Sequence, residues 1–186
     1  MKQKIPTYNE KGCVFMANIK KITKDFILPV ILAVILALLI NTFIFFKAVV
    51  TSGSMLPTIQ INEQLFATKI YNFNNIKRQD IIVFYSKELK ERLVKRVIGL
   101  PGDKVEVKQD GSVYVNDDLL SEPYIKEKGG NSGIYEVPRG KYFFLGDNRP
   151  ISFDSRYWKD PYISKDDILG KTRLIIYPFN KIGSIK

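Results

Sequence analysis

The chain has no histidine and only one cysteine, Cys13, among its 186 residues. Without histidine it cannot form a Ser-His-Asp or Cys-His catalytic couple or a histidine-ligated zinc site. A single cysteine also excludes a disulfide within the chain. We therefore expect no metal and no cofactor, and any hydrolytic base must be Lys, Asp, Glu, Tyr or a chain terminus.

Acidic residues are also few relative to basic ones. The chain carries 19 Asp and Glu against 29 Lys and Arg, a formal net charge of +10 at pH 7. Its 45% hydrophobic and 26% charged residues are typical of a folded protein of one ordinary domain with an appendage. In a chain that meets a membrane, this charge favours an anionic phospholipid surface over nucleic acid as the partner.

Residues 26–46, FILPVILAVILALLINTFIFF, contain no charged side chain. As a helix with a rise of about 1.5 Å per residue this run is roughly 31 Å long, enough to cross a bilayer. It exceeds the apolar region of about 7 to 15 residues in a cleavable signal peptide, and no Ala-x-Ala site follows it. The run predicts a transmembrane helix; a buried core helix is the alternative.

The flanks of this run predict its orientation. Residues 1–25 form a basic tail, whereas no cation lies between Lys47 and Lys69. Because positive charge is retained on the cytoplasmic side, we expect a single-pass cell-membrane protein with a cytoplasmic N-terminus and an extracytoplasmic domain, residues 47–186. Cys13 then lies on the reducing side. The lysines of the tail are Lys2, Lys4, Lys11, Lys20, Lys21 and Lys24.

The outer domain has the patterns of strands, and no sustained helical period follows Phe46. Alternating residues on both sides of Asp110-Gly111 predict a hairpin. We expect an all-β domain of packed antiparallel sheets or a barrel. A polar, glycine-rich stretch, 121–134, predicts a mobile excursion. The predicted strands are 64–71, 80–85, 92–100, 104–108, 112–116, 141–145 and 174–177.

Two residues could supply hydrolytic chemistry. Ser54 lies in the segment TSGSMLPT, shortly after the apolar run, where it could be a nucleophile on a tight turn, although serines near glycines usually only form turns. Lys95 lies in a predicted strand, on one face with Leu93 and Val97, while Arg96 points to the other face. A lysine buried among apolar side chains can be a neutral base, but a solvent-facing strand lysine fits the same pattern.

A third cluster combines acids and arginines in LGDNRPISFDSRYW, residues 145–158. The density of charged side chains in this segment indicates a network of salt bridges that holds a loop. Asp147 could also reach Arg96. An aspartic-protease dyad of Asp147 and Asp154 is the competing hypothesis. The neighbouring arginines argue against it, because they would keep both carboxylates ionised.

These segments together resemble the bacterial type I signal peptidases, in the compact Gram-positive form. The resemblance covers the apolar run and then, in order, SGSMLPT (52–58), RQDIIVF (78–84), KRVIGLPGD (95–103) and GDNRPISFDSRYW (146–158). It implies a membrane-anchored serine endopeptidase that removes signal peptides from exported preproteins and cleaves after small residues. It also implies a Ser-Lys dyad, which suits a chain without histidine.

The resemblance assigns roles to individual residues. Ser54 becomes the nucleophile and Lys95 the general base, with the Ser52 hydroxyl and the Ser54 N–H as the oxyanion hole. Pro150-Ile151 depart from the Asp-Asn that family members often have there. The remaining implied roles are orientation of the Lys95 amine by Ser152, salt-bridge support by Asp147, Asp154, Arg96 and Arg156, and a substrate pocket formed by Met55, Ile59 and Val94.

Two other functions share parts of this pattern. A self-cleaving, repressor-like Ser-Lys protease needs a helical DNA-binding module where this chain has its apolar run. A catalytically dead binding module of the same fold should lack Ser54 or Lys95, and both are present. We therefore expect a monomeric peptidase whose partners are preproteins and anionic phospholipid, without nucleic acid or metal.

Overall fold

The computed structural model describes residues 23–185. The predicted basic tail before residue 23, including Cys13, lies outside the described residues. A π-helical turn, Thr23–Ile27, leads into helix α2, Leu28–Phe43. Lys24–Phe43 is long and apolar enough to cross a membrane, and no residue of α2 is buried by protein. A helix that is apolar on all sides is stable in hydrocarbon, so it fits a membrane anchor.

The helix ends before the predicted boundary. Phe45 and Phe46, which were expected to complete the apolar helix, begin strand β1, Phe45–Val49. They pair with Thr68 and Ala67 of β2, Gln64–Lys69. Hydropathy does not distinguish apolar residues of a helix from those of the strand that follows, so only this long-range pairing locates the boundary.

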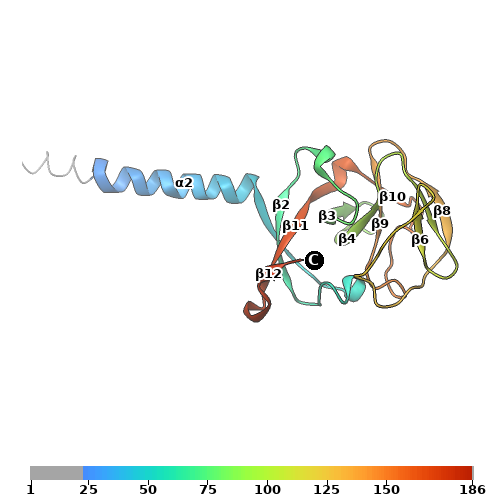
Figure 1. The fold of residues 1–186 in the computed structure, drawn as a ribbon. Coiled ribbons are helices and arrows are strands. Elements are labelled where there is room, and N and C mark those ends of the chain that lie inside the picture. The colour runs from blue at the N-terminus through green and yellow to red at the C-terminus, as the bar shows by residue number, and fades with distance from the viewer. Residues whose placement is uncertain (1–22, 186) are drawn as a thin grey trace, which may run out of the picture. The chain divides into compact units, whose positions relative to one another are not determined.

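From Phe45 onward the described chain is β-structure connected by turns, which confirms the predicted all-β class (Figure 1). Four single 3-10 turns interrupt it, at Gly53–Met55 (η2), Phe73–Asn75 (η3), Lys165–Asp167 (η4) and Phe179–Lys181 (η5). The strands after β2 are β3 Ile81–Ser86, β4 Glu91–Gly99, β5 Lys104–Val107, β6 Val113–Val115, β7 Asp118–Leu119, β8 Gly133–Glu136, β9 Lys141–Leu145, β10 Tyr162–Ser164, β11 Ile168–Tyr177 and β12 Gly183–Ser184.

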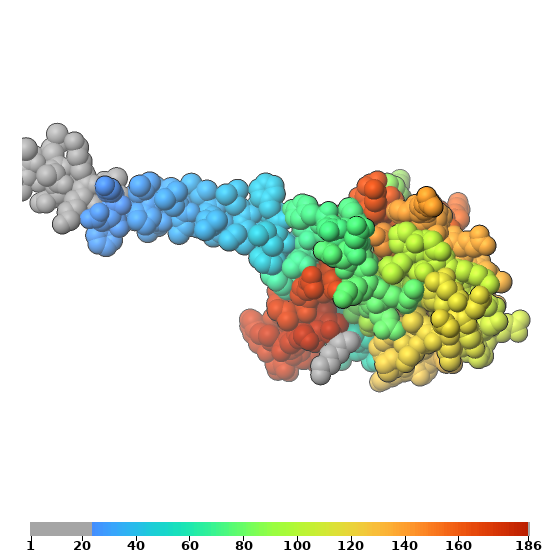
Figure 2. Space-filling model, turned by 45° about the horizontal axis from the view of Figure 1, so that its top comes forward, coloured from blue at the N-terminus to red at the C-terminus, as the bar shows by residue number. Residues whose placement is uncertain are grey.

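The strands form two antiparallel sheets. The larger one has the order β1-β2-β11-β3-β4-β9-β10, with β12 paired to β11, and the smaller one has the order β7-β6-β5-β8. The smaller sheet is inserted in the sequence between β4 and β9, which are neighbours in the larger sheet. The red C-terminal segment and the cyan-to-green β2 region lie side by side in Figure 2, as the pairing of β2 with β11 requires.

All seven predicted strands are present, and the hairpin at Asp110-Gly111 joins β5 to β6. The turn needs glycine because Gly111 has a φ of +77°. Strands β1, β7, β8, β10 and β12 were not predicted. Each has at most five residues and is recognised through its pairing with a neighbouring strand.

Three buried clusters hold the domain together, and two of them flank the candidate site. One joins β3, β4 and β9 through Ile82, Phe84, Val97 and Phe144. Another packs the segment around η2 onto β2 and β3 through Met55, Ile59, Leu65 and Ile81. A third joins the two sheets, mainly through valines of β5 and β6. The site therefore rests on packed strands rather than on free loops.

Candidate active site

Ser54 lies in the short turn η2, directly after extended residue Ser52. Its side chain is largely buried, and its Oγ lies 3.3 Å from the Oγ of Ser52. The next residue, Met55, is 1% exposed and accepts a backbone hydrogen bond from Ile59 at 2.9 Å. Because Met55 is packed into the core, the backbone of the turn is fixed and both hydroxyls face the same region.

Lys95 occupies the middle of β4 and is only 2% exposed. Its register partner on β3 is Ile82, a member of the apolar cluster. Its Nζ donates a 3.0 Å hydrogen bond to Ser152 Oγ. Burial lowers the pKa of Lys95 to about 8, against a smaller opposing effect of Asp154. This lysine can therefore lose its proton near neutral pH.

The loop after β9 connects Ser54 and Lys95. The backbone N–H of Asn148 donates to the Ser54 carbonyl at 3.0 Å, and the N–H of Ser152 donates to the Asn148 carbonyl at 2.9 Å. A Cβ on Gly146 would lie 2.2 Å from Ser152 Oγ and 2.5 Å from the Ser54 carbonyl. Glycine is therefore required there, and the loop brings the Ser54 turn close to the hydroxyl that holds Lys95.

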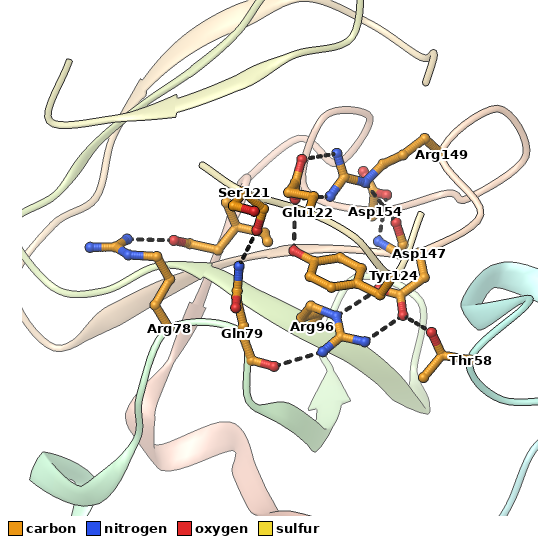
Figure 3. A network of polar contacts seen from close by, with 12 residues as sticks. Thr58, Arg78, Gln79, Arg96, Ser121, Glu122, Tyr124, Asp147, Arg149 and Asp154 are labelled. Carbon is orange, nitrogen blue, oxygen red and sulfur yellow. Dashed lines mark hydrogen bonds and ion pairs between the residues drawn. The ribbon is translucent and has the colours of Figure 1, made fainter. Parts of the chain in front are cut away.

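Arg96 and Asp147 form a buried, bidentate salt bridge. Arg96 Nε donates to Oδ1 at 2.8 Å and Nη2 to Oδ2 at 2.6 Å, while Nη1 donates to the Gln79 carbonyl at 2.9 Å. The hydroxyl of Thr58 donates to Asp147 Oδ2 at 2.5 Å. Asp147 thus joins the strand of Lys95 to the segment that follows Ser54 (Figure 3).

A second bidentate pair, Asp154 and Arg156, is entirely inaccessible to solvent. Arg156 donates from Nε and Nη2 to the two carboxylate oxygens, each at 2.8 Å. Asp154 Oδ2 also accepts from the N–H of Gly146 at 3.0 Å. Each aspartate of the hypothesised protease dyad is thus paired with its own arginine, an arrangement that suits structural support rather than a shared proton.

The sequence matches a family of known activity. A family model described as "Signal peptidase, peptidase S26" matches residues 23–177. The chain belongs to the signal peptidase family. The family suggested by the sequence motifs is thereby confirmed.

Several signal peptidases are similar over most of the chain. Signal peptidase I P of Bacillus subtilis subsp. natto is 41% identical over 169 residues, which covers 84% of this chain and 90% of that protein. Signal peptidase I of Leptolyngbya laminosa is 40% identical over 164 residues, covering 83% and 79%. A solved signal peptidase I from Enterococcus faecalis V583 is 36% identical, covers 52% of this chain and 96% of its own, and has a TM-score of 0.47. The chain is therefore a peptidase of the signal peptidase I type.

The three residues predicted to line a substrate pocket differ in exposure. Met55 and Ile59 are members of the buried cluster, and Ile59 has no exposed surface. Val94 packs against the same cluster and is partly exposed. Val94 is thus accessible from outside, whereas Ile59 is buried and supports the turn from beneath.

Among residues 23–185, no group of three or more Cys, Asp or Glu side chains is arranged to hold a metal ion. An open cleft of about 390 Å³ lies next to the Ser54 turn. It is bordered by both polar and apolar groups from the turn, the loop after β9 and the segment before β8. The lining residues are Leu56, Pro57, Gln60, Lys126, Glu127, Asp147 and Asn148.

Some residues that hold the site were not predicted. Thr58 and Gln79 contact the Arg96–Asp147 pair, although neither has a sequence feature beyond its place inside a family motif. Glu122 and Tyr124 lie in the polar stretch interpreted as a mobile excursion, yet they bind Arg149 and Arg96. No local feature of the sequence indicates these contacts.

Proposed function

We propose that this signal peptidase cleaves preproteins with a Ser54–Lys95 dyad. In the first step, the neutral Lys95 amine accepts the proton of Ser54 Oγ as this oxygen attacks the scissile carbonyl carbon. The oxyanion is stabilised by the Ser54 N–H and the Ser52 hydroxyl. The Lys95 ammonium then donates its proton to the leaving amine, and the carbon–nitrogen bond breaks to leave an acyl-enzyme.

Deacylation uses the same base. Lys95 accepts a proton from water, the hydroxide attacks the ester carbon, and the proton returns to Ser54 as the carbon–oxygen bond breaks. Ser152 holds the amine through its hydroxyl, while Asp147, Arg96, Asp154 and Arg156 keep the surrounding loop in place. The observation that carries the proposal is a buried lysine with a pKa of about 8, held by the loop that also binds the Ser54 backbone.

The substrates we propose are signal-peptide-bearing preproteins, cleaved after small residues that fit a shallow pocket bordered by Val94. Met55 and Ile59, which are buried behind the Ser54 turn, would support this pocket without forming its surface. The tail, residues 1–25, would be cytoplasmic and the catalytic domain, from residue 47, extracytoplasmic, in a monomer that contacts anionic phospholipid. The anchor would then hold Ser54 close to the membrane, because Ser54 follows Phe46 by eight residues, at most about 29 Å of chain.

The test is cleavage of a model preprotein by the full chain in lipid vesicles, with the mass of both fragments measured. Ser54→Ala and Lys95→Ala should each lower kcat/KM at least about 10³-fold, because they remove the nucleophile and the base. The exposed controls Ser184→Ala and Lys159→Ala should retain activity. Activity of the unchanged chain should rise as pH increases through about 8, where Lys95 loses its proton. Substantial cleavage by either dyad variant would refute the mechanism.

A further inference from the structure

The polar segment from residue 121 to residue 130, called the strap below, lies between β7 and β8 of the smaller sheet and is hydrogen-bonded to the loop after β9. We propose that Glu122 and Tyr124 of the strap are positioning residues, which hold the Lys95 amine and the Ser54 turn in place through two buried arginines, Arg96 and Arg149. This inference rests on the dyad proposed above. It assigns a role in the reaction to a segment whose composition indicates a flexible loop.

The first contact is between Tyr124 and Arg96. The ring centre of Tyr124 lies 3.8 Å from the guanidinium carbon of Arg96, so the ring covers one face of the cation (Figure 3). The edge of the same guanidinium is occupied by Asp147 and the Gln79 carbonyl. Arg96 is thus enclosed on its edge and on one face, and its orientation is determined by all three partners.

The second contact is between Glu122 and Arg149, whose side chain is 1% exposed. The Glu122 carboxylate accepts from both terminal nitrogens of Arg149, and Glu122 is the acid that pairs with this cation. The Tyr124 hydroxyl donates to Glu122 Oε1 at 2.8 Å. Burial raises the pKa of this hydroxyl, so it remains a donor at physiological pH. The two strap residues therefore act as one unit.

Both ends of the strap are also attached. At its start, Gln79 Nε2 donates to the Ser121 carbonyl at 2.7 Å. At its end, Arg156 Nη1 donates to the Gly129 carbonyl at 2.5 Å. Gly130 has a φ of +90°, and a Cβ there would lie 1.9 Å from Arg156 Nη1, so only glycine lets the strap approach so closely. This segment, yellow in Figure 2, is part of the visible surface, but its inner side is pinned to buried arginines.

The restraint reaches the reacting groups by two routes. Arg149 Nε donates to the Gly146 carbonyl at 2.9 Å, which holds the loop that binds the Ser54 carbonyl and carries Ser152. Arg96 directly follows Lys95 in β4. Restraining the Arg96 side chain therefore also restrains the rotation of the strand about its own axis at Lys95, the proposed general base. The strap thus restrains Lys95 from the strand side and Ser54 from the loop side.

The experiment compares Glu122→Gln, Tyr124→Leu and Tyr124→Phe with a matched control, Glu136→Gln, an exposed glutamate of β8. For each, kcat, KM and the pH midpoint of kcat are measured on a model preprotein, together with the melting temperature. We expect Glu122→Gln and Tyr124→Leu to lower kcat 10- to 100-fold with KM within about twofold. Tyr124→Phe, which keeps the ring over Arg96, should retain most of the activity.

The pH midpoint separates positioning from stability. Loss of the negative charge of Glu122 would by itself lower the pKa of Lys95, whereas a displaced and more hydrated amine would have a higher pKa. We expect the midpoint to rise by about half a unit or more in both disruptive variants, and to stay unchanged in the control. The charged groups that act on the Lys95 amine are Asp154, Arg156, Asp147 and Glu91, and all four remain in these variants.

The outcomes are distinct. A lower melting temperature with unchanged kcat and pH midpoint, measured well below melting, would overturn the positioning role and leave the strap a structural element. If Glu122→Gln does not fold because Arg149 is left unpaired, Tyr124→Leu decides the question, since it leaves no buried charge without a counter-ion. Retained activity of Lys95→Ala would instead overturn the dyad itself.

Discussion

Lys95 and Arg96 are neighbours in β4 that lie on opposite faces of the strand and have opposite electrostatic surroundings. Lys95 and Arg96 are 2% and 4% exposed, so both are buried to the same degree. The guanidinium of Arg96 is bound by a carboxylate, a carbonyl and an aromatic ring. The Lys95 amine binds a neutral hydroxyl, that of Ser152.

The difference shows how the protein obtains a base without histidine. An ion pair favours the charged form of a buried group, whereas burial next to neutral groups favours the uncharged form. Arg96, a permanent cation, is paired with Asp147, and this pair ties the strand of Lys95 to the loop after β9 that binds the Ser54 carbonyl. Lys95 has a lowered pKa because its surroundings stabilise a neutral amine. The same strand therefore supplies a structural cation and a candidate base on opposite sides.

The substitution with the largest expected effect is Lys95→Arg. It keeps a cation at the position but removes the ability to become neutral, because a guanidinium is not deprotonated in proteins. We expect kcat/KM for preprotein cleavage to fall at least about 10³-fold, as for loss of the base. The matched change, Arg96→Lys, keeps the charge of the paired face and should retain more activity. Equal activity of Lys95→Arg and the unchanged chain would show that no neutral amine is needed.

A second test removes the carboxylate that pairs with Arg96. Asp147→Asn leaves Arg96 buried without its carboxylate, and we expect the free energy of unfolding to decrease by roughly 3 to 5 kcal/mol. Urea denaturation monitored by circular dichroism measures this change. Asp160→Asn is the control, since its salt bridge with Lys141 is solvent-exposed and should contribute less than about 1 kcal/mol. A similar loss in both variants would show that burial of the pair is not what matters.

The third test has the smallest expected effect and concerns how the buried Lys95 amine changes the free energy of unfolding. The folded-state pKa of Lys95, about 8, is lower than the unfolded value of 10.5. Between these values the unfolded chain binds more protons, so this residue's contribution to stability increases with pH and is least favourable below pH 8. Lys95→Met should therefore raise the free energy of unfolding at pH 7 by about 2 kcal/mol, after loss of the Ser152 hydrogen bond.

The measurement is denaturant unfolding of both proteins between pH 7 and 10.5. The advantage of Lys95→Met should decline over this range and disappear at its upper end. Lys159→Met, at an exposed position, should show no such trend. An advantage that does not change with pH would mean that burial imposes no charge penalty on Lys95.

Features that depend on local pattern could be predicted from the sequence. The apolar run, seven of the strands and the Asp110-Gly111 hairpin follow from hydropathy, alternation and turn chemistry. The order of the motifs also predicted the family. The end of the helix was not predictable, because Phe45 and Phe46 are as apolar as the residues before them and only their pairing with β2 shows that they form a strand.

The strap gave the clearest failure of local reasoning. Its glycines and charges are typical of a mobile loop, and its sequence does not indicate that Glu122 pairs with Arg149 rather than with Lys126 or Lys128. Its partner, Arg149, is 27 positions away, on a loop that follows a different sheet. Composition therefore described the exposed side of the strap and not its contacts.

The sequence by itself determined the kinds of chemistry available, a membrane-compatible helix, and the alternation that separates Lys95 from Arg96. These follow from side-chain type and backbone period, which are local properties. Only the tertiary structure decided that Arg96 is paired with Asp147 and that Lys95 is buried, which lowers its pKa. The electrostatic environment of a buried group depends on neighbours from distant parts of the chain, here Ser152 and Asp147, which folding alone brings to β4.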